Sequence, residues 1–293
     1  MPERASSLAA ALDEAFDRLE RSGVAHPRRE ATTLWAAVAG DAVTPGDVWL
    51  GRGREPDSET VERFRAAVDR RASGIPFAYA VGRASFRTLD LKLDPRALIP
   101  RPETEGLVDL VLSHFRATCN VQRGGGGVVA DVGTGSGCIA LALAVEGDFE
   151  RVIAVERSAE AAALARENVA LMRRAVPVEV REGDWLAPLA GERLAAIVAN
   201  PPYLTEAEYA GLDPAVREFE PREALVGGAD GLGPTRALLA GGRALLGPGG
   251  LIALELDERR AEQTRVLARS HGWSGAVVHE DVFGRPRFLL ATC

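Results

Sequence analysis

The stretch Asp131-Val132-Gly133-Thr134-Gly135-Ser136-Gly137 decides the fold class of this chain of 293 residues. An apolar run typical of a buried strand, residues 128–132, leads into it, and residues 138–145 continue as an apolar helix. Glycines at the end of a strand let a ligand approach the backbone, and the helix N-terminus beyond them offers free N–H groups to an anion. A plain strand-to-helix turn can look the same, so the rest of the sequence has to decide between the two.

The sequence around this turn alternates between short apolar runs and helical patterns. Four further runs are strand candidates, at residues 152–155, 178–180, 195–199 and 251–256, and helical stretches separate most of them. Short buried strands that alternate with helices are typical of βαβ units, in which helices cover both faces of a parallel sheet. We therefore predict a doubly wound α/β domain over residues 105–293.

The N-terminal part of the chain carries a different pattern. Over residues 1–73 the apolar residues recur at helical spacing, first at Leu8, Leu12, Phe16 and Leu19. Residues 84–94 then alternate between apolar and polar side chains, as the strands of a half-buried hairpin do. We predict a small helical domain over residues 1–73 that recognises the substrate, and a β-hairpin linker over residues 74–104.

Composition excludes several classes of protein. The hydrophobic share of 46% and the charged share of 26% are those of a soluble globular protein. No apolar run approaches the ~20 residues that cross a bilayer, and acidic and basic residues interrupt the N-terminus, which therefore lacks the apolar core of a secretory signal. We expect a cytoplasmic protein that does not bind membranes.

The cysteines, the histidines and the charge narrow the function further. The three cysteines, Cys119, Cys138 and Cys293, and the four histidines show no metal-ligand spacing, so we expect no disulfide framework and no metal site. Residues 1–98 are neutral overall, and the whole net charge of −7 lies in residues 99–293. Because neutralising phosphates normally requires a basic excess, we expect no direct binding of nucleic acid.

Polar side chains at the ends of successive predicted strands suggest a nucleoside cofactor. Glu156 ends the second strand and could accept hydrogen bonds from both hydroxyls of a ribose. Asp184 follows the third strand and could accept from an adenine amino group, while Trp185 could cover the ring or belong to the core. The G-x-G-x-G spacing fits S-adenosylmethionine better than a dinucleotide. The predicted cofactor-binding residues are Asp131, Gly133, Thr134, Gly135, Ser136, Gly137, Glu156, Asp184, Trp185 and Asn200.

A second motif, Asn200-Pro201-Pro202-Tyr203, follows the fourth predicted strand at the same edge of the sheet. Two prolines stiffen the turn before any substrate arrives. The side-chain oxygen of Asn200 and the carbonyl of Pro201 make two acceptors that could hold the two hydrogens of an NH₂ group. Tyr203 could stack on the amide or ring that bears this group. We predict Asn200, Pro201 and Tyr203 as catalytic, and all four residues of the motif as substrate-binding.

With the glycine-rich turn, this motif resembles class I methyltransferases that act on planar NH₂ groups in DNA adenine or protein glutamine. Two more stretches, residues 98–105 (LIPRPETE) and residues 220–232 (EPREALVGGADGL), resemble motifs of the HemK/PrmC family, the peptide chain release factor glutamine methyltransferases. The resemblance covers nearly the whole chain and implies a helical N-terminal domain, a hairpin linker and a mostly parallel seven-stranded sheet.

The resemblance also implies a reaction. The methyl group of S-adenosylmethionine would be transferred to the side-chain amide nitrogen, N5, of the glutamine in the Gly-Gly-Gln loop of class I release factors, leaving S-adenosylhomocysteine. The alternatives are an amino-methyltransferase of nucleic acid (adenine N6 or guanine N2), a glutamine methyltransferase of a ribosomal protein, and a noncatalytic adapter that binds S-adenosylmethionine.

Three positions depart from the family pattern. Glu156 stands where an aspartate is usual, the often-found Glu-x-Gly after the fifth strand reads Glu255-Leu256-Asp257, and an expected aromatic-glycine pair reads Arg87-Thr88. The roles of Arg101, Glu103 and Arg222 stay open between the wall of the active site and structural ion pairs, with Glu220 or Glu223 as partners of Arg222. We expect the charged helix at residues 257–269 to present a solvated face.

Overall fold

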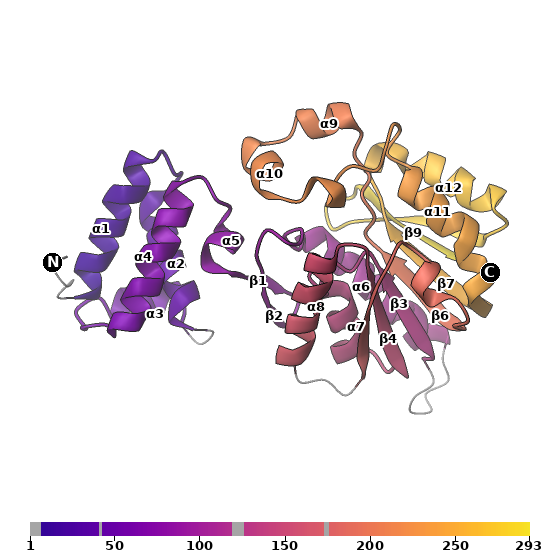
Figure 1. Ribbon diagram of the computed structural model, residues 1–293, viewed down its shortest axis with the longest axis horizontal. Coiled ribbons are helices and arrows are strands. Elements are labelled where there is room, and N and C mark those ends of the chain that lie inside the picture. Colours follow the sequence, from indigo (N-terminus) through magenta and orange to yellow (C-terminus); the bar gives the residue numbers. More distant parts are fainter. Residues whose placement is uncertain (1–6, 41–42, 119–125, 173–175) are drawn as a thin grey trace. The chain divides into compact units, whose positions relative to one another are not determined.

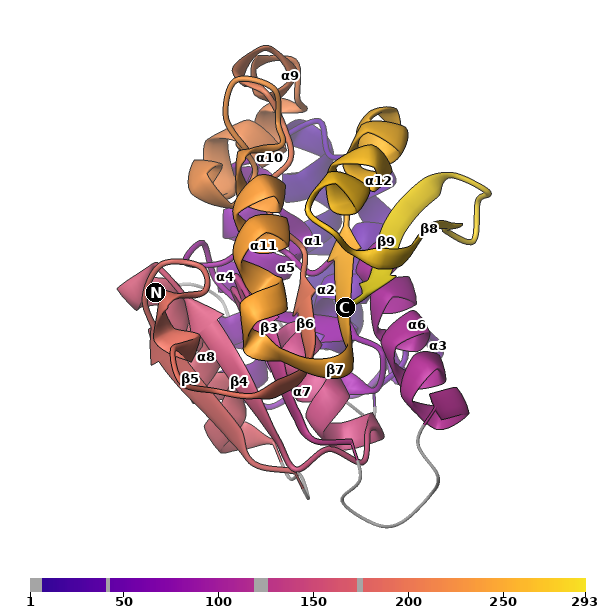
Figure 2. The ribbon, with the colours of Figure 1, turned by 90° about the vertical axis from the view of Figure 1, so that its right-hand side faces the viewer.

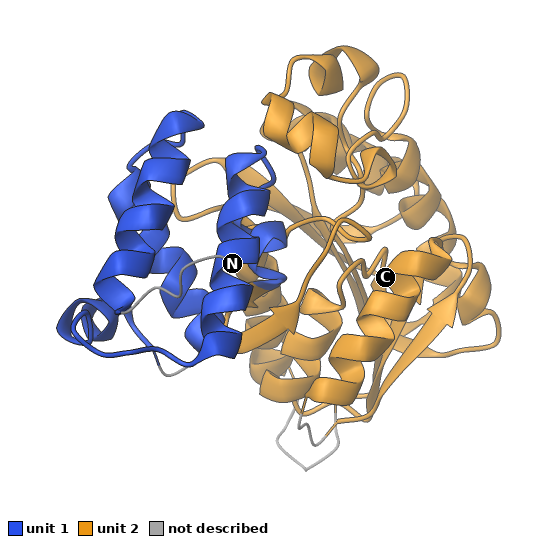
Figure 3. Cartoon of the chain, turned by 60° about the vertical axis from the view of Figure 1, so that its left-hand side comes forward, with its two compact units in different colours: residues 1–83 blue, residues 84–293 orange. Residues whose placement is uncertain are grey.

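The chain divides into two compact units, residues 1–83 and residues 84–293 (Figures 1 and 3). The computed structural model describes residues 7–40, 43–118, 126–172 and 176–293, so Cys119 lies outside the described residues. Within these ranges, no helix is long and apolar enough to span a membrane.

The first unit is helical, as the apolar spacing predicts. Its helices are α1 (Leu8–Arg21), α2 (Pro27–Ala39), α3 (Pro45–Leu50), α4 (Ser58–Ala72) and α5 (Phe77–Val81). Ser7, Thr44 and Asp57 cap the N-termini of α1, α3 and α4, each by accepting a hydrogen bond from a backbone N–H of the first turn. The apolar faces of α1, α2 and α4 share one core. In it the rings of Trp35 and Phe64 pack edge to face, with their centroids 4.9 Å apart.

A two-stranded hairpin, β1 (Arg83–Phe86) and β2 (Leu89–Lys92), follows the helices, and its apolar side chains pack into the core of the second unit. Arg87, one of the departures from the family pattern, sits in its turn with a φ of 53°. Its guanidinium binds Glu146 at 2.7 Å and Asp109 at 2.8 Å, and its N–H donates to Glu105. Arg87 therefore ties the turn to two helices of the second unit.

The second unit is built on a seven-stranded sheet in the order β5-β4-β3-β6-β7-β9-β8. All the pairings from β5 to β7 are parallel, and only β9 runs against its neighbours. The strands are β3 (Val128–Val132), β4 (Arg151–Glu156), β5 (Val178–Glu182), β6 (Leu194–Ala199), β7 (Leu246–Glu255), β8 (Ser274–Glu280) and β9 (Pro286–Thr292). The first five coincide with the five predicted strand candidates.

Helices cover both faces of this sheet (Figure 2). Helices α6 (Pro102–Thr118), α7 (Cys138–Glu146) and α8 (Ala159–Leu171) pack on one face, and α11 (Gly233–Gly242) and α12 (Ala261–Ser270) pack on the other. The short helices α9 (Glu206–Ala210) and α10 (Pro214–Phe219) bury no side chain of their own. The predicted doubly wound α/β fold is confirmed.

The order of the strands creates a switch point between β3 and β6. From β3 the chain builds outward through β4 to β5, then crosses back to lay β6 along the other side of β3. Asp131 of β3 pairs with Val198 of β6, so the loops that leave these two strands start next to each other. Open α/β sheets bind ligands in the crevice that forms at such a point.

A buried asparagine that the sequence analysis did not single out joins the hairpin to the glycine-rich turn. Asn168 of α8 is fully buried. Its Oδ1 accepts from the N–H of Lys92 at 2.8 Å, and its Nδ2 donates to the carbonyls of Lys92 and Ser136 at 3.0 and 2.9 Å. One side chain thus satisfies three backbone groups in two separate segments.

Asn168→Ala is expected to lower the free energy of unfolding by about 3 kcal/mol, because it leaves buried backbone groups without partners. Urea denaturation followed by circular dichroism measures the change. Arg166→Ala on the same helix is the control, since it removes an exposed ion pair with Glu182, worth less than ~1 kcal/mol, and a long, exposed hydrogen bond to the carbonyl of Val180. Equal effects of the two substitutions would contradict a bridging role for Asn168.

Candidate functional site

The glycine-rich turn leaves β3 with its backbone open to a ligand. Gly133, Gly135 and Gly137 have φ values of 79°, 55° and 86°, which L side chains rarely adopt. A Cβ at Gly133 would meet no other atom within 4 Å. The N–H groups of Gly133 and Thr134 both donate to the carbonyl of Val155 at the end of β4. Hydrogen bonds to β4 therefore hold the turn on one side, while the backbone at Gly133 has open space on the other side.

Asp131 lies beneath the turn and not in the cavity above it. Its side chain is fully buried, and its Oδ2 accepts from the Thr134 hydroxyl at 2.5 Å and from the N–H of Ala140 in the first turn of α7 at 3.0 Å. Burial raises the pKa of Asp131 to about 7, although these two hydrogen bonds lower it. The carboxyl holds the turn and caps α7.

Glu156 ends β4 beside the turn, where the sequence places it. One carboxylate oxygen accepts from the N–H of Gly135 at 2.9 Å, and the other accepts from the N–H of Ser158 at 2.9 Å. Each oxygen keeps a second lone pair, and Glu156 lines the cavity. The carboxylate is thus held in place by backbone donors while it still offers acceptors to a ligand.

Asp184 and Trp185 follow β5 and also line the cavity. Trp185 has a φ of 45°, unusual for a bulky side chain, and is only partly buried. Its ring also packs against the core cluster on the α11 face of the sheet. Both readings of this tryptophan, core residue and cavity wall, therefore apply at once.

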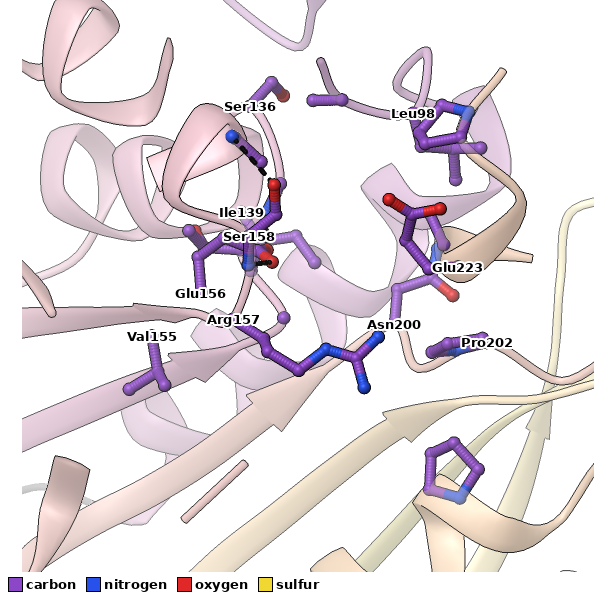
Figure 4. Close-up of a pocket in the computed structure, with 18 of the residues that line it drawn as sticks. Leu98, Ser136, Ile139, Val155, Glu156, Arg157, Ser158, Asn200, Pro202 and Glu223 are labelled. Atoms are coloured by element: carbon purple, nitrogen blue, oxygen red, sulfur yellow. Dashed lines mark hydrogen bonds between the residues drawn. The ribbon is translucent and has the colours of Figure 1, made fainter. Parts of the chain in front are cut away.

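These segments surround one cavity of about 380 Å³, within the size range of small-molecule sites. Figure 4 shows Glu156, Arg157 and Ser158 on one side of it, and Asn200, Pro202 and Glu223 on another. Of the predicted cofactor-binding residues, eight line the cavity: Gly133, Thr134, Gly135, Ser136, Glu156, Asp184, Trp185 and Asn200. Gly137 begins α7 and, like Asp131, is not part of the lining.

The motif after β6 reaches the same cavity through Asn200 and Pro202. Nδ2 of Asn200 donates to the hydroxyl of Thr104 at 3.1 Å. Pro201 is buried, and neither it nor Tyr203 is part of the lining. Burial, together with the charge of the neighbouring Glu255, raises the pKa of Tyr203 to about 12. The structure therefore brings only the first and third residues of the motif to the cavity wall.

The glycine-containing segment at residues 220–232 supports this motif from outside. The N–H of Leu204 donates to the carbonyl of Leu225 at 2.9 Å, and the N–H of Gly227 donates to the carbonyl of Leu204 at 2.8 Å. A Cβ at Gly227 would lie 2.3 Å from the carbonyl oxygen of Pro202, and one at Gly231 would lie 2.3 Å from that of Tyr203. Only glycine permits so close a backbone approach at these two positions.

Ion pairs fix the segments that frame the cavity. Arg101 lines it and binds the buried carboxylate of Glu220 at 2.6 Å, so this arginine is both wall and structural partner. Glu220 also accepts from the N–H of Ile99 at 3.2 Å. Arg222 pairs with Glu206 and not with Glu220 or Glu223, the partners expected from the sequence.

The expectation of a solvated face at residues 257–269 is wrong at its start. Asp257 is buried, and its carboxylate binds Arg259 and Arg260. Arg260 also binds Glu208 at 2.8 Å and donates from Nε to the carbonyl of Asp230 at 2.7 Å. This arginine joins the segment after β7 to helix α9 and to the loop at Asp230, which a count of charges along the sequence does not reveal.

The strand order, the glycine-rich turn and the cavity at the switch point together define a class I methyltransferase. In keeping with this fold, the structure resembles a methyltransferase from Pyrococcus furiosus, with a TM-score of 0.51 and 20% identity over 76% of this chain and 98% of that chain. Two family models also match the sequence, the PrmC N-terminal domain at residues 10–82 and the methyltransferase small domain at residues 108–213.

Curated relatives narrow the class to one family. The chain is 42% identical to the release factor glutamine methyltransferase of Moorella thermoacetica, over 97% of this chain and 98% of the relative. It is 41% identical to that of Deinococcus radiodurans, over 96% of each chain. The chain belongs to the family of release factor glutamine methyltransferases.

Glu156→Gln is expected to weaken the binding of S-adenosylmethionine roughly tenfold or more, because an amide cannot accept from Gly135 and Ser158 at once and loses charge-assisted hydrogen bonds worth about 1.5–3 kcal/mol. Isothermal titration calorimetry gives the dissociation constant. Glu160→Gln, an exposed position in the first turn of α8, is the control and should leave the constant unchanged. An unchanged constant for Glu156→Gln would remove Glu156 from the cofactor site.

Proposed function

We propose that this chain transfers a methyl group from S-adenosylmethionine to the side-chain amide nitrogen, N5, of a glutamine in a protein, and that the protein is a class I peptide chain release factor with its Gly-Gly-Gln loop. The observation that carries the proposal is the position of Asn200. Its amide lines the cavity at the switch point, and its NH₂ end is bound to Thr104. The oxygen end is therefore available as an acceptor.

The cavity fits the proposed cofactor. The open backbone at Gly133 offers room for a carboxylate or amino group beside the start of α7, whose N-terminus favours negative charge. Glu156 offers acceptors for the ribose hydroxyls, and Asp184 and Trp185 offer an acceptor and a flat apolar surface for adenine. When bound, S-adenosylmethionine would supply a methyl group on a positively charged sulfur, and its product would be S-adenosylhomocysteine.

The residues after β6 address the chemical difficulty of the reaction. An amide nitrogen is a poor nucleophile, because its lone pair is delocalised into the carbonyl. Asn200 Oδ1 and the carbonyl of Pro201 would each accept one N–H of the substrate amide, which orients the nitrogen and favours the positive charge that develops on it. Pro202 stiffens the turn. Since Pro201 and Tyr203 do not line the cavity, the Pro201 acceptor and a contact of Tyr203 with the plane of the substrate amide stay predictions from the sequence.

The two units suggest a division of labour. We propose that the helical residues 1–73 contribute to recognition of the protein substrate, and that residues 105–293 bind the cofactor and carry out the transfer. The match of residues 10–82 to the PrmC N-terminal domain, separate from the match of residues 108–213 to the methyltransferase small domain, supports this proposal.

Transfer of labelled methyl from S-adenosylmethionine tests the proposed substrate. Purified release factor, a release factor with its Gly-Gly-Gln glutamine replaced, ribosomal proteins, DNA and RNA are offered in parallel. Label on the intact release factor alone supports the proposal. Label on nucleic acid, or on a ribosomal protein alone, would overturn the substrate, and a failure to label any of them would leave only an adapter that binds the cofactor.

Asn200→Ala is expected to lower the single-turnover rate by about 10²–10³, the loss typical for one preorganised hydrogen-bonding group. Binding of S-adenosylmethionine should change no more than about tenfold, as for one peripheral contact. Asn200→Asp keeps an acceptor and should retain more activity than alanine. Calorimetry and rapid-quench kinetics on both variants separate the two effects, and equal losses of binding and rate would make Asn200 a cofactor ligand only.

A further inference from the structure

A chain of buried hydrogen bonds lies behind Asn200. Nδ2 of Asn200 donates to Oγ1 of Thr104 at 3.1 Å, and Oγ1 of Thr104 donates to Oε2 of Glu255 at 2.7 Å. The Thr104 and Glu255 side chains are 3% and 2% exposed, so water does not compete for these bonds. The three residues come from the end of β6, the first turn of α6 and the end of β7.

The number of available protons fixes the direction of this chain. A threonine hydroxyl has one hydrogen, and here that hydrogen is donated to the carboxylate of Glu255. Oγ1 of Thr104 can then only accept from Asn200, so the end of the amide that faces it has to be NH₂. The opposite end is Oδ1, for which the described part of the chain provides no hydrogen-bond donor.

Glu255 accepts the hydroxyl hydrogen of Thr104 at the end of this chain of hydrogen bonds. Burial raises the pKa of Glu255 to about 7, although the hydrogen bond from Thr104 and the charge of Arg287 act against this rise. Glu103 is an acidic neighbour that also raises the pKa. Besides burial, the charges of Glu255 and Arg287 act on the pKa of Tyr203, which Glu255 raises and Arg287 lowers. The carboxyl of Glu255 thus accepts the Thr104 hydroxyl in a buried position, with a cation nearby.

We propose that Thr104 and Glu255 are positioning residues, which hold the amide of Asn200 with its oxygen toward the substrate nitrogen. The inference rests on the proposed function, because it assigns how the acceptor of the methyl-transfer step is oriented. Without the Thr104 hydroxyl the amide is free to turn over and to present NH₂ to the substrate NH₂. Two donors would then face each other, and the preorganisation of the acceptor would be lost.

Thr104→Val tests the inference, since valine keeps the shape of threonine and removes only the hydroxyl. The single-turnover rate should fall roughly tenfold, well short of the 10²–10³ expected for direct loss of the Asn200 acceptor. The dissociation constant of S-adenosylmethionine should not change. Thr104→Ser, which restores a hydroxyl, should recover most of the rate.

Thr264→Val is the matched control, because Thr264 of α12 is another fully buried threonine, whose hydroxyl has no partner among the described residues. It should leave the rate unchanged. Thermal melting of every variant shows whether the protein is folded under assay conditions. If Thr104→Val only lowered the melting temperature and kept the wild-type rate, Thr104 would be a structural residue and the inference would fail.

A double-mutant cycle asks whether Thr104 acts through Asn200. Once Asn200→Ala has removed the amide, Thr104→Val should cost no further rate, so the double variant should match Asn200→Ala. Rate losses that multiply would overturn the inference, because Thr104 would then act independently of Asn200. Wild-type protein is assayed first. Its failure to methylate the release factor contradicts the proposed function, whereas equal rates for the wild type and Thr104→Val contradict only this inference.

Discussion

The parallel pairing of β3 with β6 is the constraint on which the site depends. In a parallel sheet the carboxyl ends of the strands meet at one edge, and the reversal of the strand order beside β3 keeps the helices from closing the crevice there. The turn that follows β3 and the turn that follows β6 are therefore neighbours, although about seventy residues of sequence separate Asp131 from Asn200. The glycine-rich turn and the turn after β6 come together without any long loop to join them.

Buried carboxyl groups hold these turns in shape. Asp131 supports the glycine-rich turn and caps α7, Glu255 anchors Thr104 and Asn200, and Glu220 ties residues 98–101 to the segment at residues 220–232. Burying a carboxyl group is costly unless hydrogen bonds or cations satisfy it, and both Asp131 and Glu255 have raised pKa values for that reason. In return, the hydrogen bonds of these buried carboxyl groups fix the geometry of the turns that form the cavity wall.

The sequence predicted the parts of the fold that depend on local pattern. Strands β3 to β7 follow from short apolar runs, the hairpin follows from a period of two, and the N-terminal helices follow from a period of 3.6. The roles of Thr104, Asn168 and Arg260 could not be predicted, because these hydrogen-bond partners lie between 30 and 151 positions away in the sequence. A polar residue at helical spacing from the apolar residues of the buried face, as at Asn168 in α8, was the available signal.

The departure at Asp257 shows how a changed position can preserve a site. The family often has a glycine there, whereas Asp257 caps the short helix η4 (Glu258–Arg260) by accepting from the N–H of Arg259 at 2.8 Å. Through Arg260 it is linked to Glu208, which lies just beyond the motif after β6, and to the carbonyl of Asp230. Glu255, two residues earlier, keeps its place at the end of β7 and its bond to Thr104. The side chain of Asp257 therefore adds a link between these segments. The orientation of Asn200 still depends on Thr104 and Glu255.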